Sequence, residues 1–544
     1  MPKASLTYLQ PSPDVSADNH LSLLIRRAET EVEAGHFEDV KAALEPYAGR
    51  GNHNVDLLLA FALTGLRQPQ QAAPLLVSAG LTNQGGHHPA VKLIDRFGTL
   101  NQREAARDTI EATHRLTPND PRILDALGDI LCHLGRYDEA IEALDRSLAI
   151  RPVSPLTLNF KAIALMEKGE VEQAAEIFRK VLELMPDNAS ALSNLACLYS
   201  ATNRPEDALA LYRSAVLERP TNAVIRLNYS ISLLKAERYA QGWTEHEWRL
   251  KLPGHSQLPE QRLLPSLGAG VDIRGKRVLV TQEEGLGDTL MYLRYLPALA
   301  RRGAIVHVWV PETLGDLCRR VEGIAITQVG GTLPEYDWHC PFISLPRVFV
   351  GTEDEFGAPV PYLHADPLKV AEARKLLPQN GKLNVGLVWG GAPRPHLTSA
   401  MMLDRRRSMH LTQLDLLGKI PGINLISFQK GPYAEEGTTL PCGTPLYDLM
   451  PYCDTLDDTA AFLMGIDVLV SVDTSVVHLA GGLGCPVLLM DRFDNCWRWL
   501  SGRESSVWYP DLTIFRQQRP RDWTGVVKQV AKALRAMSVK KRSS

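Results

Sequence analysis

The sequence predicts an all-α solenoid followed by an α/β domain of two Rossmann-like lobes. Three observations lead to this prediction: a helix-turn-helix pattern that recurs every 34 residues, a stretch rich in Pro and Gly near residue 260, and short β-branched runs that alternate with helical stretches after it. A chain of 544 residues also requires more than one domain, because a single hydrophobic core stops growing well below that size.

Composition narrows the class of protein. The 59 Lys and Arg residues against 62 Asp and Glu residues leave a net charge of -3, which does not favour nucleic-acid binding. The 8 cysteines form no C-x-x-C pair, so reduced thiols are expected instead of a zinc site or a disulfide framework. The chain begins without a signal-like segment and has no apolar run long enough to cross a bilayer. We therefore expect a cytoplasmic protein without a membrane span.

The first half contains a regular repeat. Its period is marked by four prolines, Pro118, Pro152, Pro186 and Pro220. In the clearest unit, Gly135-Arg136-Tyr137 forms the predicted turn between two helices, and small residues lie where those helices approach each other. This period is typical of tetratricopeptide (TPR) repeats, and we expect six to seven of them in residues 20–250, after a disordered stretch 1–19. Such a solenoid either offers a groove to a protein or serves as a spacer or dimerisation arm.

The second half alternates strands and helices. Residues 251–275 are expected to form a linker because they contain many Pro and Gly residues and no apolar period. Predicted strands then include RVLVTQ, IVHVWV, NVGLVWGG and DVLVSVD. We expect one lobe in residues 276–380, a second in 381–537 that ends in an amphipathic helix, and a basic tail in 538–544. Open parallel sheets bind ligands beyond the carboxyl ends of their strands, so the site is expected between the lobes.

The first site motif is TQEEGLGDTL, directly after the first predicted strand. Gly285 and Gly287 allow a tight turn there, and Asp288 begins a helix. Two interpretations of Asp288 remain open. It is either an N-cap or a general base that removes the proton from an acceptor hydroxyl.

The second motif is DVLVSVDTSVVHLAGG, in which a strand leads into a helix. The free N–H groups at such a helix start bind anions. Asp473 is expected to bind sugar hydroxyls, whereas Thr474 and Ser475 are expected to bind phosphate oxygens. His478 is either a hydrogen-bond donor to the phosphate or a satisfied core histidine.

Basic residues follow two further strands. Arg407 lies in DRRRSM, and Gln429 and Lys430 lie in SFQKG. Such residues either neutralise a departing phosphate without a metal or are simply solvated. The predicted strand order favours the first interpretation, because it places Arg407 and Lys430 at the edge where the site is expected.

The motifs also form a familiar series. In order they are EGLGDTL with RYLP, YDWHCPFISLP, GLVWGG, DRRRSM, SFQKG, SVDTSVVHLAG and WRWL. Together they resemble the bacterial TPR-containing glycosyltransferases whose catalytic domain is related to the family 9 heptosyltransferases. The resemblance implies a GT-B fold and an inverting, metal-independent enzyme without a cofactor that uses a nucleotide sugar. It also implies that Asp288 is the catalytic base.

The resemblance assigns further roles by motif position. Asp473, Thr474 and His478 are implied to hold the donor sugar and phosphate, with Arg407 and Lys430 as the matching basic positions. The candidate catalytic residues are Asp288, His478 and Lys430. The candidate donor-binding residues are Gly285, Gly287, Arg407, Gln429, Asp473, Thr474 and Ser475. Two departures, Glu284 in place of Gln and the loop 392–403, put the identity of the donor in doubt.

The expected function is sugar transfer from a nucleotide sugar to a Ser or Thr hydroxyl of a protein held by the repeats. Heptosyltransferases do not usually carry a TPR array, so the array favours a protein acceptor, of which flagellin is the most specific case. Two alternatives stay open: a heptosyltransferase-like enzyme acting on a lipid-linked glycan, and a non-catalytic TPR scaffold with a vestigial transferase domain.

Overall fold

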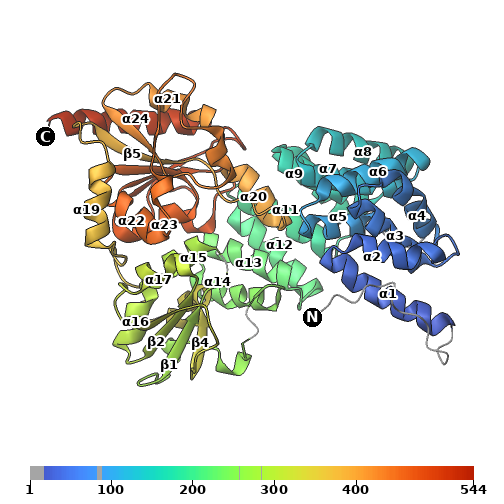
Figure 1. Ribbon diagram of the computed structural model, residues 1–544, viewed down its shortest axis with the longest axis horizontal. Helices are drawn as coiled ribbons and strands as arrows, with labels where there is room; N and C mark the ends of the chain where they lie inside the picture. The colour runs from blue at the N-terminus through green and yellow to red at the C-terminus, as the bar shows by residue number, and fades with distance from the viewer. Residues whose placement is uncertain (1–16, 83–87, 256–257, 284, 544) are drawn as a thin grey trace. The chain divides into compact units, whose positions relative to one another are not determined.

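The computed structural model describes residues 17–82, 88–255, 258–283 and 285–543 (Figure 1). Most of the expected disordered stretch, residues 1–16, lies outside the described residues, and helix α1 begins at Ala17. Contacts divide the chain into two compact units: unit 1 is Met1–Asn194 with Pro393–Leu403, and unit 2 is Leu195–Ala392 with Asp404–Ser544.

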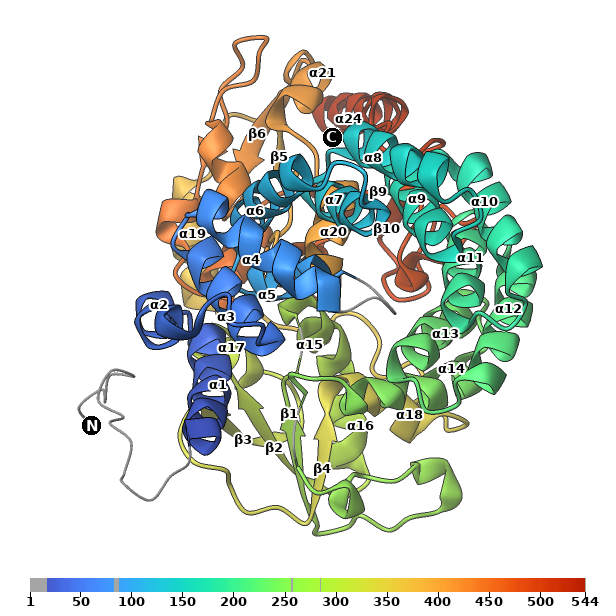
Figure 2. The ribbon, with the colours of Figure 1, turned by 90° about the vertical axis from the view of Figure 1, so that its right-hand side faces the viewer.

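Unit 1 is built from helices that pack in succession along the chain (Figure 2). Its helices are α1 (Ala17–Ala34), α2 (Phe37–Leu44), α3 (His53–Gly65), α4 (Pro69–Thr82), α5 (Ala90–Thr99), α6 (Arg103–Leu116), α7 (Pro121–Leu134), α8 (Tyr137–Ile150), α9 (Pro155–Lys168) and α10 (Val171–Leu184). The boundary between the units falls inside α11 (Ala189–Ala201).

The repeat pattern corresponds to these helices. Each of the four repeat prolines lies two residues beyond a helix end, after α6, α8, α10 and α12 (Pro205–Glu218). Gly135 ends α7 with a φ of 81°, a left-handed conformation that glycine adopts without a steric penalty. A Cβ on Gly128 would lie 2.4 Å from Leu144 Cγ, so only glycine allows α7 and α8 to pack this closely. The predicted helical solenoid is confirmed.

Within the described residues, unit 2 contains the last repeat helices and all the strands, while helix α20 (Thr398–Arg407) begins in unit 1 and ends in unit 2. The helices after α12 are α13 (Ala223–Lys235), α14 (Tyr239–His246), α15 (Leu286–Tyr292), α16 (Leu296–Arg301), α17 (Glu312–Cys318), α18 (Leu345–Phe349), α19 (Pro367–Leu376), α20 (Thr398–Arg407), α21 (Asp415–Gly418), α22 (Leu456–Leu463), α23 (Ser475–Leu483) and α24 (Thr524–Ser543). The strands are β1 (Arg277–Thr281), β2 (Ile305–Val310), β3 (Ile324–Val329), β4 (Trp338–Pro341), β5 (Leu383–Val388), β6 (Ile423–Ser427), β7 (Tyr447–Asp448), β8 (Val468–Val472), β9 (Val487–Asp491) and β10 (Leu512–Arg516). The 3-10 helices used below are η3 (Glu247–Lys251), η4 (Glu260–Arg262), η5 (Leu267–Ala269), η7 (Phe342–Ser344) and η11 (Trp497–Trp499).

The strands form two separate parallel sheets, as the sequence predicts for two Rossmann-like lobes. The first sheet has the order β3-β2-β1-β4 and the second the order β10-β9-β8-β5-β6-β7. Strand β8 shows why the second sheet needs helices on both of its faces. Val468 and Val470 pack in the cluster that includes α24, whereas Leu469 between them packs in the cluster that includes α22 and α23. The predicted fold class, an all-α solenoid followed by a two-lobed α/β domain, is confirmed.

Strand order fixes where a ligand site is favoured. In the first sheet the chain moves from β1 to β2 and β3, and then returns to β4 on the other side of β1. In the second sheet it moves from β5 to β6 and β7, and then returns to β8 on the other side of β5. Such switch points are where open parallel sheets bind ligands. The turns that follow β1, β5 and β8 are therefore the ones to examine.

The structure divides the chain at a different place from the linker expected in residues 251–275. Leu234 of α13 and Trp243 of α14 belong to the same buried cluster as the first sheet. Within the expected linker, Leu264 is fully buried, and its amide donates to the His339 carbonyl oxygen at 2.8 Å. Pro and Gly do break this segment into the short turns η4 and η5, but its leucines supply core residues between them. The Pro and Gly content thus marks local turns and not a detached linker.

The C-terminal end is also more regular than expected. The predicted amphipathic helix is present as α24, and it continues through residues 538–543, which we expected to form a basic tail. Lys541 pairs there with Asp467, which gives the basic end of the helix a partner.

Candidate functional site

The turn after β1 presents Asp288 at the start of α15. Gly285 occupies the N-cap position, and Asp288 lies in the first turn of the helix with its amide donating to the Gly285 carbonyl oxygen at 3.1 Å. Asp288 is therefore not the N-cap. Its carboxylate is about one-fifth exposed and accepts a hydrogen bond from the guanidinium of Arg498. Glu284, a departure from the family motif, lies outside the described residues.

Arg498 is the main residue of this site to which sequence reasoning gave no role. It lies in η11, with its guanidinium 4.6 Å from the centre of the Trp497 ring. Burial alone would lower the pKa of Arg498, but the charge of Asp288 outweighs it and holds that pKa well above its usual value. An arginine between two tryptophans in the WRWL motif was the available signal. The ion pair joins the two lobes, because Asp288 follows the first sheet and Arg498 belongs to the second lobe.

Gly287 brings the Asp288 turn against the start of α23. A Cβ on Gly287 would lie 3.0 Å from His478 Cδ2 and 3.3 Å from Ser475 Cα, so a larger residue would push α15 away from α23. Thr474 is the N-cap of α23, with extended backbone and no side-chain cap hydrogen bond. Its hydroxyl lies 3.2 Å from that of Ser471. The turn that carries Asp288 and the strand-to-helix turn that carries Thr474, which are separate motifs in the sequence, therefore lie in contact in the structure.

His478 has the buried, hydrogen-bonded ring that the core-histidine interpretation predicts, and its role as a donor to the phosphate stays a prediction. Its ring is buried, stacks on Trp499 with ring centres 5.5 Å apart, and has Nδ1 2.9 Å from the Tyr509 hydroxyl. Burial, assisted by the positive charge of Arg498, lowers the pKa of His478 to about 4. A neutral imidazole held in this way can give a ligand at most one hydrogen bond and no positive charge.

Arg407 reaches the same edge of the second sheet as Asp473. Its Nη1 donates to the Asp473 carbonyl oxygen at 3.3 Å, and its Nε donates to Asp404 Oδ1 at 3.0 Å. A Cβ on Gly391, just after β5, would lie 2.2 Å from Arg407 Nη2. The ends of β5 and β8, which flank the switch point of this sheet, are thus joined by one arginine.

Gln429 and Lys430 follow β6, one strand further along. The Gln429 amide accepts from the Trp389 and Gly390 amides, each at 2.9 Å, and donates to the carbonyl oxygens of Gly390 and Lys430. The Gln429 side chain thus links the end of β5 to the end of β6, and these four hydrogen bonds use all of its donors and acceptors. Lys430 donates to the Cys453 carbonyl oxygen. Across the described residues, no hydrogen bond or ion pair links Lys430 to the Asp288–Arg498 pair.

Among the residues that the structure describes, no helix is long and apolar enough to cross a membrane. The same residues hold no group of three or more His, Cys, Asp and Glu side chains placed to bind a metal ion. All eight cysteines are free.

Comparisons with known proteins support the helical half. The tetratricopeptide repeat family matches residues 91–155 and 165–223. Protein FlbA of Caulobacter vibrioides is 25% identical to this chain over 343 residues, which cover 58% of this chain and 55% of FlbA. The chain therefore spans about half the length of that curated relative.

Two solved structures are similar to parts of this chain. The E. coli ADP-heptose LPS heptosyltransferase II is 13% identical, with a TM-score of 0.34, and the match covers 49% of this chain and 99% of that one. A tetratricopeptide repeat protein from Parabacteroides merdae is 18% identical, with a TM-score of 0.31, and the match covers 43% of this chain and 93% of that one.

Proposed function

We propose that this chain is an inverting glycosyltransferase that moves a sugar from a nucleotide sugar to a Ser or Thr hydroxyl of a protein acceptor. One observation carries the proposal: a carboxylate, Asp288, is paired with Arg498 where the turn after β1 meets the start of α23. Transfer needs a base for the acceptor proton and positive charge for the departing phosphate, and this place supplies one side chain of each kind.

The proposed reaction follows from these positions. The acceptor hydroxyl attacks the anomeric carbon of the donor sugar while Asp288 takes its proton. The bond from that carbon to the phosphate oxygen breaks, and the nucleotide leaves with the electron pair. Arg498, Arg407 and the free N–H groups at the start of α23 stabilise the charge on the leaving group. His478 adds a neutral hydrogen bond.

The remaining candidate residues have narrower proposed roles. Gly285 and Gly287 shape the turn, and the carboxylate of Asp473 binds donor sugar hydroxyls, with Thr474 and Ser475 on the phosphate. Gln429 keeps the ends of β5 and β6 in register, because its amide is already saturated. Lys430 can serve the leaving group only by giving up its hydrogen bond to the Cys453 carbonyl oxygen. No metal has a role in this proposal.

The acceptor is proposed to bind the repeats. TPR arrays present a concave surface that commonly holds proteins, and tethering an acceptor raises its local concentration at the site to roughly millimolar. Flagellin is the most specific acceptor that we propose.

The test has a binding step and a transfer step. We expect a UDP-, GDP- or CMP-linked sugar to raise the melting temperature of the full chain, and intact-mass spectra of bacterial surface proteins to lose a sugar mass when the gene is deleted. No stabilisation by any donor would favour a non-catalytic scaffold. A donor that binds while only a glycan acceptor is modified would favour action on a lipid-linked glycan.

A further inference from the structure

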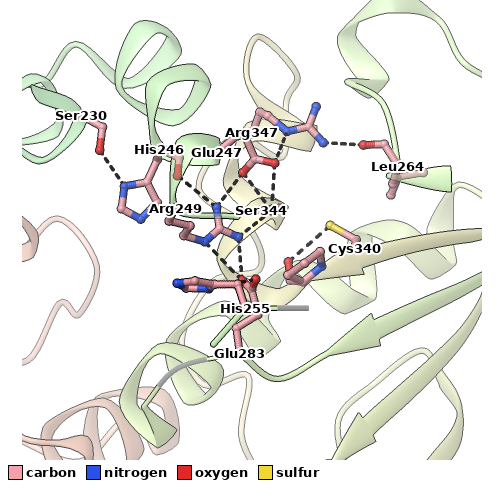
Figure 3. Close-up of polar contacts among 11 residues, drawn as sticks. Ser230, His246, Glu247, Arg249, His255, Leu264, Glu283, Cys340, Ser344 and Arg347 are labelled. Carbon is pink, nitrogen blue, oxygen red and sulfur yellow. Dashed lines mark hydrogen bonds and ion pairs between the residues drawn. The ribbon is translucent and has the colours of Figure 1, made fainter. Parts of the chain in front are cut away.

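The turn that ends the last repeat contains a fully buried arginine. Arg249 lies in η3 and has no exposed side-chain surface. Figure 3 shows its guanidinium at the centre of a group of polar side chains from three segments of unit 2. A buried charge of this kind is kept only where its partners are fixed in place.

Two carboxylates and a hydroxyl surround this guanidinium. Nη2 donates to Glu283 at 2.7 Å and to the Ser344 hydroxyl at 2.7 Å, while Nη1 donates to Glu247 at 2.8 Å. Glu247 also accepts from Ser344 and pairs with Arg347 at 3.3 Å. Two positive and two negative side chains therefore lie together, and of these Arg249 and Glu283 are fully buried while Glu247 and Arg347 reach the surface in part.

Glu283 links this group to the proposed catalytic turn. It follows β1 and stands five residues before Asp288, and its carboxylate has no exposed surface. Burial alone would raise the pKa of Glu283, but His255 and Arg249 hold it below its usual value. Glu283, just after β1, is thus held by a charge that the last repeat supplies.

The same repeat also contacts the other side of the Asp288–Arg498 pair. The Trp243 ring of α14 packs edge-on against Trp497 at 5.2 Å and against Tyr292 of α15 at 6.2 Å. Trp497 is the ring over which Arg498 lies. Residues of one repeat therefore support both partners of the pair.

We propose that Arg249 is a positioning residue for Asp288, acting through the carboxylate of Glu283. The proposal rests on the function proposed above and extends it, because it makes the last repeat part of the catalytic scaffold. Without the guanidinium, Glu283 would be a buried carboxylate without its main partner, and the turn after β1 would shift to relieve it. A displacement of about 1 Å at a reacting group costs on the order of 10²-fold in rate.

The test compares three variants of the full chain. Arg249→Met is expected to lower kcat for transfer by roughly 10- to 100-fold, with the donor KM unchanged, because the donor contacts come from α23 and Arg407. Arg249→Lys should recover part of the rate. The control is Arg226→Met, which breaks a partly exposed pair with Glu245, at 2.7 Å, in the same repeat. Arg226 also contacts Pro220 and the Trp248 ring, and none of these partners belongs to the turn after β1. Arg226→Met should leave kcat unchanged.

A second measurement does not depend on activity. Hydrogen exchange followed by mass spectrometry should show faster exchange in the peptide 278–292 of Arg249→Met and no change there in Arg226→Met. Should Arg249→Met fail to fold, the double variant Arg249→Met with Glu283→Gln should fold, because it leaves no unpaired buried carboxylate. Since it still lacks the hydrogen bonds from the guanidinium to residue 283, it is expected to show faster exchange in the same peptide and a lower kcat than the natural chain.

The possible results separate the two proposals. Unchanged exchange in a folded Arg249 variant, or a kcat loss equal to that of the control, would overturn the positioning role. Absence of any transfer by the natural chain, with faster exchange in Arg249→Met, would instead count against the proposed function alone.

Discussion

The repeats of unit 1 and the last repeat in unit 2 share one sequence period but pack in different ways. In unit 1, Phe178 of α10 is fully buried within the helical array, and Gly128 lets neighbouring helices touch. In unit 2, Trp243 packs against rings of the α/β domain, and Arg249 pairs with Glu283 beside the first sheet. The period thus fixes the shape of a repeat, whereas the residues on its free face decide what it supports.

Truncation gives the largest expected effect. A fragment 187–544, which keeps α11 to α14, should fold, whereas 270–544 should aggregate or fail to unfold cooperatively. The shorter fragment loses the partners of Tyr292 and Trp497 and leaves Glu283 without Arg249, and breaking a buried ion pair alone costs about 3–5 kcal/mol. Circular dichroism melting curves of the two fragments compare them directly. A cooperative 270–544 would show that the last repeat is separable after all.

The next effect is on the proposed chemistry. Asp288→Asn should reduce transfer by ~10²- to 10⁴-fold, the usual effect of removing a general base, while the donor still binds. Initial rates with donor and acceptor at saturation measure this. Near-normal transfer by the folded variant would remove Asp288 from the role of base.

Two large-to-small substitutions then separate the two kinds of repeat. Phe178→Ala and Trp243→Ala should each destabilise by about 3–5 kcal/mol, because each leaves a cavity in a buried cluster. Only Trp243→Ala should also slow transfer, since its ring packs on Trp497 and Tyr292. Calorimetry and rate measurements on both variants check this. Equal rates would mean that the last repeat supports the fold without supporting the site.

Acid gives the smallest effect, and both units contain a suitable histidine. Burial lowers the pKa of His88 in unit 1 and of His478 in unit 2 to about 4. The Nδ1 of His88 accepts from the Ala90 amide at 3.1 Å, which requires that nitrogen to be unprotonated. An unfolded histidine binds its proton near pH 6.5, so the unfolded state takes up more protons between about pH 6.5 and pH 4. Stability therefore falls as the pH is lowered through this range.

The size of that loss is about 2 kcal/mol per histidine between pH 7 and pH 5. His88→Gln should reduce the acid sensitivity of the unit 1 transition only, and His478→Gln that of the unit 2 transition only. Calorimetric scans at the two pH values measure both. Transitions that shift together in either variant would contradict the division into two units.

Local pattern was enough for the fold but not for all of the site. Proline spacing located the helix ends, and short apolar runs located two parallel sheets, because each signal lies within one repeat or one strand. The turns carrying Asp288 and His478 are in contact, as strand order suggested. Arg498, by contrast, lies 210 residues from Asp288, and no periodicity links them.

The sequence did not predict that residues 251–275 pack into the core, and the reason is related. The Pro and Gly residues of this segment indicated turns correctly, but Leu264 and Leu267 are too few to produce a periodic signal. The sequence likewise showed no sign of a role for Arg249, since its partners come from Glu283 and Ser344 further along the chain. Contacts between residues so far apart in the sequence depend on how helices and strands pack after they have formed. A short stretch of sequence does not contain that information.

The aromatic cluster around Trp243 has an optical consequence. All 9 tryptophans of the chain lie at or beyond residue 243, and every one of them belongs to unit 2. Intrinsic tryptophan fluorescence therefore does not detect unfolding of unit 1 and reports on the α/β domain with its last repeat. Far-ultraviolet dichroism, in contrast, is dominated by helices of both units. The ratio of the two signals during unfolding follows each unit without any label.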